Sequence, residues 1–165
     1  MFNDKLIKKL RGKQFSYLIS IDENYLPCYI EYCIMKSMSF SHTVSTAKTI
    51  ESAIQSLTQN LKEIGFGVLG SLNFKKILEE KGLEFKENYE LLEVCNPKLA
   101  KQVLDSNPEL GLLLPCTIAV YQKKGRNFIS LAKPSALLGL VSENNMQFLG
   151  NEIEKNLIDI IEKSK

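Results

Sequence analysis

The feature that most constrains this chain is the run from Tyr89 to Tyr121, in which two strand-like segments enclose a short amphipathic helix. The first segment is apolar and leads into Cys95-Asn96-Pro97. Asn96 is a favourable helix N-cap and Pro97 suits the first helical position, so a helix is predicted from Pro97 to about Ser106. The rest of the fold is expected to be built around this strand, helix and strand.

Upstream, alternation predicts a strand at Phe40–Val44, and Thr49 can cap the helix that follows. Gly65 is suited to end that helix in the left-handed conformation. A short strand at Phe66–Leu69 and a helix around Phe74 come next, giving an apparent βαβ-type beginning. The apolar stripe of the long helix comprises Ile50, Ala53, Ile54, Leu57, Leu61 and Ile64.

Downstream, Lys123-Lys124-Gly125-Arg126 has the composition of a hairpin turn. It joins predicted strands at Thr117–Gln122 and Asn127–Ala132, and Pro134 opens a short helix. The last helix presents its apolar stripe at Met146, Leu149, Ile153, Leu157, Ile160 and Ile161.

Residues 1–37 differ in pattern from the remainder and predict an N-terminal extension. A short helix precedes two strand-like runs, Phe15–Ile21 and Tyr25–Met35, which can pair as a hairpin. Residues 38–165 are predicted to form an α+β domain with two layers, a mixed or antiparallel sheet packed on helices. A lone hairpin is marginal in water, so the extension is expected to pack on something.

Composition narrows the class of partner. The net charge of +2 is too small to indicate a polyanion-binding surface, so no nucleic-acid partner is expected. No run approaches the roughly 20 apolar residues needed to cross a bilayer. The opening residues also lack the apolar core of a secretory signal. We therefore expect a cytoplasmic protein that does not bind membranes.

Four cysteines in such a chain do not suggest a disulfide framework. Cys28 and Cys33 are separated by four residues, and neither a CxxC pair nor a histidine cluster accompanies them. We therefore predict no metal site and no cofactor. His42 is the single histidine, and we interpret it as a strand residue without a catalytic role.

Cys95 precedes a predicted helix N-terminus, where backbone N–H groups favour a thiolate and lower the thiol pKa. Cys116 follows Pro115 at the start of a strand, and the two strands can lie side by side. Three interpretations stay open: two small buried side chains, thiols that line a ligand pocket, and redox or nucleophilic thiols. The candidate ligand-binding residues are Cys95, Asn96, Pro97, Pro115 and Cys116.

Four segments in register resemble one known family. They are residues 64–69 (IGFGVL), 95–100 (CNPKLA), 108–116 (PELGLLLPC) and 134–141 (PSALLGLV), and the likeness covers about residues 40–165. The chain is similar to the domain of unknown function 302 family. That resemblance implies a compact α+β domain that forms homodimers and has no settled activity, with Cys95 and Cys116 both at family positions.

Two functional hypotheses follow. The first is a dimeric module that binds a small ligand or a protein, with a pocket near Cys95 and Cys116, because no complete catalytic constellation is visible. The alternative is a thiol-based redox enzyme or redox sensor, in which Cys116 resolves an oxidised Cys95. Whether the protein is an enzyme is left open by the sequence.

Overall fold

The computed structural model describes residues 40–139 and 144–165. The N-terminal helix and hairpin predicted within residues 1–37, and the boundary at residue 38, lie outside the described residues and stay predictions. The elements, in chain order, are β1 (Ser41–Thr46), α3 (Ile50–Glu63), β2 (Gly67–Asn73), α4 (Phe74–Glu79), β3 (Tyr89–Cys95), α5 (Pro97–Ser106), the 3-10 helix η2 (Pro108–Leu113), β4 (Cys116–Lys123), β5 (Arg126–Ala132), α6 (Pro134–Leu138) and α7 (Asn144–Ser164).

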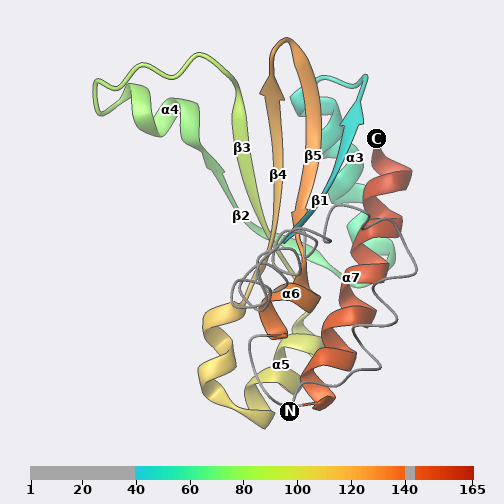
Figure 1. Ribbon diagram of the computed structural model, residues 1–165. Helices are drawn as coiled ribbons and strands as arrows, with labels where there is room; N and C mark the ends of the chain where they lie inside the picture. The colour runs from blue at the N-terminus through green and yellow to red at the C-terminus, as the bar shows by residue number, and fades with distance from the viewer. Residues whose placement is uncertain (1–39, 140–143) are drawn as a thin grey trace, which may run out of the picture. The chain divides into compact units, whose positions relative to one another are not determined.

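The strands form one five-stranded sheet in the order β1-β5-β4-β3-β2. Every neighbouring pair is antiparallel, which confirms the α+β class. The apparent βαβ beginning needs correction, because β1 and β2 occupy opposite edges of the sheet. The β4–β5 hairpin and β3 lie between them, so α3 connects the two edges rather than two neighbours (Figure 1).

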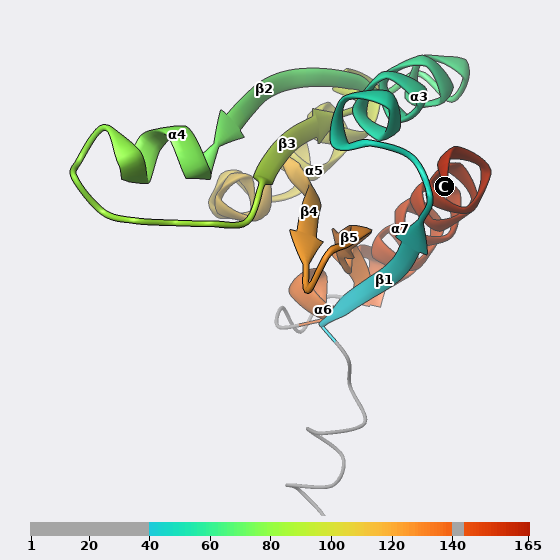
Figure 2. The same cartoon turned by 90° about the horizontal axis from the view of Figure 1, so that it is seen from above.

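Helices α3 and α7 lie side by side on one face of the sheet (Figures 1 and 2). The predicted apolar stripes of both helices point inward, and strand residues that alternate along β4, such as Ile118 and Val120, meet them. The core is completed by Leu57, Leu61, Leu92, Val94, Ile129, Leu131, Leu157 and Ile161, all almost inaccessible to solvent. We refer to this side of the sheet as the helix face and to the other side as the open face.

Helix limits follow from local capping. The Thr49 hydroxyl accepts a hydrogen bond from the backbone N–H of Ser52, and Gly65 follows the helix with a φ of 78°. Helix α5 begins and ends at Pro97 and Ser106, as predicted. The sequence predicts Leu99, Val103 and Leu104 as the buried side of α5, but Leu104 is 44% exposed while Val103 is buried. The apolar stripe of α5 is therefore narrower than the leucine pattern suggested.

A polar network joins the end of α7 to α3. The buried Ser164 hydroxyl donates to the carbonyl of Ile160 and accepts from Asn60 Nδ2 at 2.9 Å. Lys48 Nζ donates to the Ser164 carbonyl at 2.8 Å. These bonds satisfy orphan groups at the C-terminal end of α7 and fix the two helices against each other. None of the helices in the described ranges is long and apolar enough to cross a bilayer.

Candidate functional site

The two candidate cysteines lie at the same end of the sheet. Strands β3 and β4 pair so that Val94 is opposite Cys116, and Cys95 is the next residue of β3. This confirms that the strands carrying the cysteines are neighbours. Both thiols are free and partly buried.

Asn96 has a structural role at this end. Its Oδ1 accepts from the backbone N–H groups of Lys98 at 3.0 Å and Leu99 at 3.4 Å, which makes it the N-cap of α5. Its Nδ2 donates to the Ile64 carbonyl at 3.4 Å. A Cβ on Gly65 would lie 3.2 Å from that nitrogen, so a glycine is needed there both for the positive φ and for this close approach.

The thiols are not activated in the way that the sequence suggested. Burial raises the pKa of Cys95, and burial together with the charge of Cys95 raises the pKa of Cys116 to about 11. The physical reason is desolvation, which is the first cause for both thiols. The Asn96 side chain bonds the first helical N–H groups at the same place. At neutral pH both cysteines are therefore thiols.

Cys116 borders a small apolar space enclosed by the ends of the sheet and the short helices. The space has a volume of about 20 Å³, with room for roughly one water. Its walls come from Val103, Leu113, Leu114, Cys116, Ala132, Pro134, Leu137, Leu138 and Ile153. Pro115, which follows a cis peptide bond, and Pro97, at the first turn of α5, are not among them.

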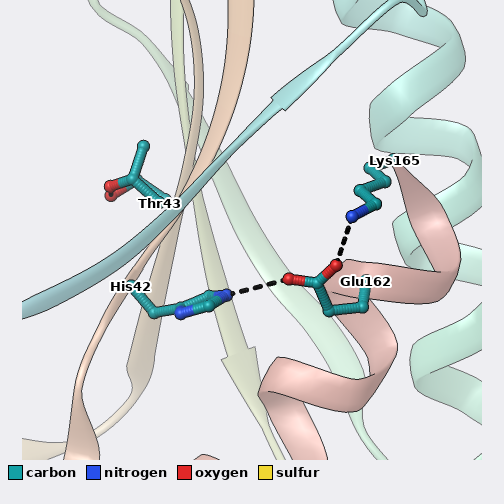
Figure 3. A network of polar contacts seen from close by, with 5 residues as sticks. His42, Thr43, Glu162 and Lys165 are labelled. Atoms are coloured by element: carbon teal, nitrogen blue, oxygen red, sulfur yellow. Dashed lines mark hydrogen bonds and ion pairs between the residues drawn. The ribbon is translucent and has the colours of Figure 1, made fainter.

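His42 is placed away from the cysteines, on the edge strand β1. Its Nε2 lies 3.3 Å from Glu162 Oε1 of α7, and Lys165 Nζ contacts the other carboxylate oxygen at 2.5 Å (Figure 3). The bond from Lys165 lowers the pKa of Glu162, with His42 adding to the effect. His42 points toward α7 while Thr43 points to the other side of the strand (Figure 3). The contacts of His42, Glu162 and Lys165 thus link an edge strand to a helix. Nowhere in the part of the chain that the structure describes do three potential metal ligands gather.

The open face carries a row of aromatic rings that the sequence analysis did not identify. Tyr89 and Tyr121 are opposite each other on β3 and β4, and Phe128 is opposite Tyr121 on β5. The Tyr89 and Tyr121 centroids are 5.5 Å apart, and those of Tyr121 and Phe128 are 5.6 Å apart, each pair inclined by 22°. Phe74 meets Tyr89 edge-on at 5.8 Å, which extends the row to the start of α4. The four rings form one continuous strip across three strands.

Apart from Glu93 and the cationic hairpin end, the remainder of the open face is small or uncharged. The residues that share it through direct cross-strand pairing are Ser41, Thr43, Ser45, Gly67, Gly70, Leu72, Leu91, Glu93, Cys95, Thr117, Ala119, Ser130 and Ala132. Neither α3 nor α7 reaches this side, because their stripes contact the alternate strand residues. Tyr121 and Phe128 are left half-buried.

Charge on the open face is confined to its two ends. Lys123 and Arg126 are opposite each other at the hairpin end, where the Arg126 guanidinium lies 6.0 Å from the Phe128 ring centre. Glu93 lies nearer the cysteine end and folds over Gly70, where a Cβ would be 2.9 Å from its Oε2. The six residue steps from Thr117 to Lys123 separate these levels by about 20 Å.

The pairing of Tyr121 with Phe128 is the part of the aromatic row that the sequence could have predicted. The two-residue turn Lys124-Gly125, with φ of 52° and 74°, fixes the hairpin register and hence places Tyr121 opposite Phe128. Tyr89 joins the row only through pairing of β3 with β4, which no local signal specifies.

Comparison with known proteins agrees with this architecture. The family model described as "Domain of unknown function DUF302" matches residues 41–164. The chain belongs to this family. A crystal structure of an uncharacterized conserved DUF302 protein from Bacillus stearothermophilus is 36% identical, with a TM-score of 0.74. The match covers 76% of this chain and 98% of that one. No curated protein matches the sequence. The DUF302 assignment thus establishes the fold and leaves the function to be inferred from the molecule.

Proposed function

We propose that this DUF302 domain is a homodimeric binding module without catalytic activity, and that two copies pair through the open face. The observation that supports this most is the aromatic strip of Phe74, Tyr89, Tyr121 and Phe128 on the side that α3 and α7 do not cover. Aromatic residues are enriched at protein interfaces and contribute most of the area that a stable interface needs.

The distribution of charge supports a second copy as the partner. A twofold axis that lies in the interface and runs across the strands reverses the strand direction. It would bring Glu93 of each copy opposite Lys123 and Arg126 of the other, since these groups lie at opposite ends of the face. Such pairing favours one orientation and the correct partner more than it adds affinity.

Sedimentation equilibrium of the full chain tests this proposal. We expect a dimer for the wild type and a shift toward monomer for Glu93→Arg, in which like charges would face each other. Adding Lys123→Glu and Arg126→Glu to Glu93→Arg should restore the dimer, because the complementarity is reversed on both sides. Glu152→Arg, on the exposed side of α7, is the matched control for charge alone.

A folded wild type that is monomeric at 100 µM would contradict the proposal, as would a dimer indifferent to all four substitutions. Far-ultraviolet circular dichroism on each variant separates loss of dimer from loss of fold. Restoration by the triple variant excludes a trivial folding defect in Glu93→Arg.

A small ligand near Cys95 and Cys116 is less well supported. The apolar walls beside Cys116 suit an apolar group, but about 20 Å³ accommodates no more than a water. Binding there would require η2 and α6 to separate. A xenon or small-hydrocarbon titration followed through the resonances of Leu114 and Leu138 tests whether this space opens.

The thiol alternative has one favourable observation, the effect of the Cys95 charge on the pKa of Cys116. Oxidation would join the two sulfur atoms with transfer of two electrons and two protons to an oxidant such as a small-molecule disulfide. The raised pKa of each thiol works against it, because the thiolate is the reacting form. Alkylation rates read separately for each cysteine against pH decide the matter: rapid labelling of Cys95 at pH 7 would favour the redox hypothesis.

A further inference from the structure

A second feature lies on the helix face, at the end of the sheet opposite the cysteines. The first turns of α3 and the paired ends of β2 and β3 enclose a half-open groove of about 380 Å³. This lies within the range of pockets that hold small organic ligands, and it is far larger than the space beside Cys116.

The groove has one apolar wall and several fixed polar groups. Ile50 and Ile54 line it one helical turn apart on α3. Asn73 and Asn88 contribute carboxamides from the strand ends, and Gln55 contributes a third from α3. Ile50 is 9% exposed, so the apolar wall is continuous with the core.

Its charge is entirely negative. Glu51 of α3 and Glu90 of β3 both line the groove, and no lysine or arginine is among the lining residues. The Glu90 carboxylate accepts a hydrogen bond from the Ser71 hydroxyl, which orients it. Neither carboxylate has a cationic partner within salt-bridge distance in the described part of the chain.

We propose that this groove binds a small organic cation, an alkyl ammonium or guanidinium compound whose charged ends pair with Glu51 and Glu90. Two carboxylates separated by an apolar wall match a molecule with cationic groups joined by a short methylene chain. The methylenes would lie on Ile50 and Ile54, and the carboxamides would accept the remaining N–H groups. An anionic ligand is disfavoured because it would meet two negative charges without a compensating cation.

This site adjoins the proposed dimer surface, because Tyr89 of the aromatic strip also lines the groove. Glu90 and Asn73, by contrast, are opposite each other on the helix face. Binding and dimerisation can be tested separately, because the carboxylates of the groove and the charges of the open face are changed by different substitutions.

The test is isothermal titration of the full chain with spermidine and agmatine, each compared with 1,4-butanediol as a neutral probe and glutarate as an anionic one. We expect heat of binding for the cations only. Glu90→Gln and Glu51→Gln should each weaken binding by about tenfold, the loss expected for one charge-assisted hydrogen bond. Glutamine at residue 90 can still accept from Ser71, which protects the fold.

Glu152→Gln is the matched control, because it removes the same charge from the exposed side of α7. Equal weakening by Glu152→Gln would show binding by net charge and overturn the proposal, as would cation binding that neither Glu51→Gln nor Glu90→Gln changes. Amide chemical shifts supply a second readout, and perturbations confined to residues 50–55, 73 and 88–90 are expected.

Discussion

The two faces of this sheet are built from the same strands but differ in how far other described elements cover them. Along β4, Ile118 and Val120 are fully buried beneath α3 and α7, while Tyr121 on the alternate side is half-buried among other rings. The apolar residues of the helix face are covered by α3 and α7 within the described chain, as any two-layer fold requires. The open face carries aromatic rings of the kind found in an interior, and among the described residues neither α3 nor α7 covers it.

The largest expected difference between the faces is in stability. Ile118→Ala should lower the free energy of unfolding by about 3 kcal/mol, because the cavity lies in a closed core. Tyr121→Ala should cost about 1 to 2 kcal/mol, since half of the ring is already in solvent. Urea unfolding at two protein concentrations measures both, and a dimer through the open face predicts that only the wild type and Ile118→Ala gain stability with concentration. Equal losses for the two variants would remove the distinction between the faces.

A second comparison concerns the two cysteines. Cys116 borders the apolar space, so Cys116→Ser buries a hydroxyl without a partner and should cost about 2 kcal/mol. Cys95→Ser should cost less, because Cys95 is the less buried thiol and its neighbourhood includes polar groups of Asn96. Thermal unfolding of both variants checks this order, and a larger loss for Cys95→Ser would reverse our assignment of their environments.

The same burial predicts a dependence on alkaline pH. The pKa of Cys116 is raised to about 11 in the folded protein, so the unfolded thiol ionises first as the pH rises. Stability from this group is complete below the ordinary thiol pKa and is lost as the pH passes through about 11. The wild type should lose at most about 3 kcal/mol more than Cys116→Ala over this interval. If the free energies of unfolding of the two proteins change with pH by the same amount, the Cys116 thiol is not desolvated.

The smallest effect is expected at Gly70 on the open face. Gly70→Ala would place a Cβ 2.9 Å from Glu93 Oε2, and the flexible carboxylate can move aside. We expect a change in unfolding free energy below about 0.5 kcal/mol. The dimerisation constant should change more, because Glu93 would be displaced from its place opposite the cationic end of a second copy. A dimer unaffected by Gly70→Ala would argue against a role for Glu93 in pairing.

Much of the fold could be predicted because its helix ends are determined locally. Thr49, Gly65 and Asn96 act through hydrogen bonds and backbone angles within a few residues, so the sequence specifies them. Strand order could not be predicted, because pairing of Ser41 with Ala132 joins segments far apart in the chain. Helix η2, which begins at Pro108, was not predicted.

The candidate site was predicted unevenly for a similar reason. The proximity of the strands that carry Cys95 and Cys116 could be predicted, because the helix between them was expected to fold back. The direction of their pKa shifts could not, because it depends on how far tertiary packing buries each thiol. The groove between Glu51 and Glu90 requires α3 to cross above β3, which only tertiary packing decides.

The position of β1 at the sheet edge affects the order in which the chain can fold during synthesis. Among the described strands β1 pairs only with β5, which ends at Ala132, so β1 must wait for almost the whole chain to be synthesised. During that interval β1 has no strand among the described elements to pair with, and α3 has no completed sheet to pack on. Both are nevertheless synthesised before the other described elements. Closure of the loop between them and the β4–β5 hairpin is therefore a late, non-local event. The last helix, α7, can complete the core only once Ile161 has left the ribosome, so the hydrophobic core closes at the end of synthesis.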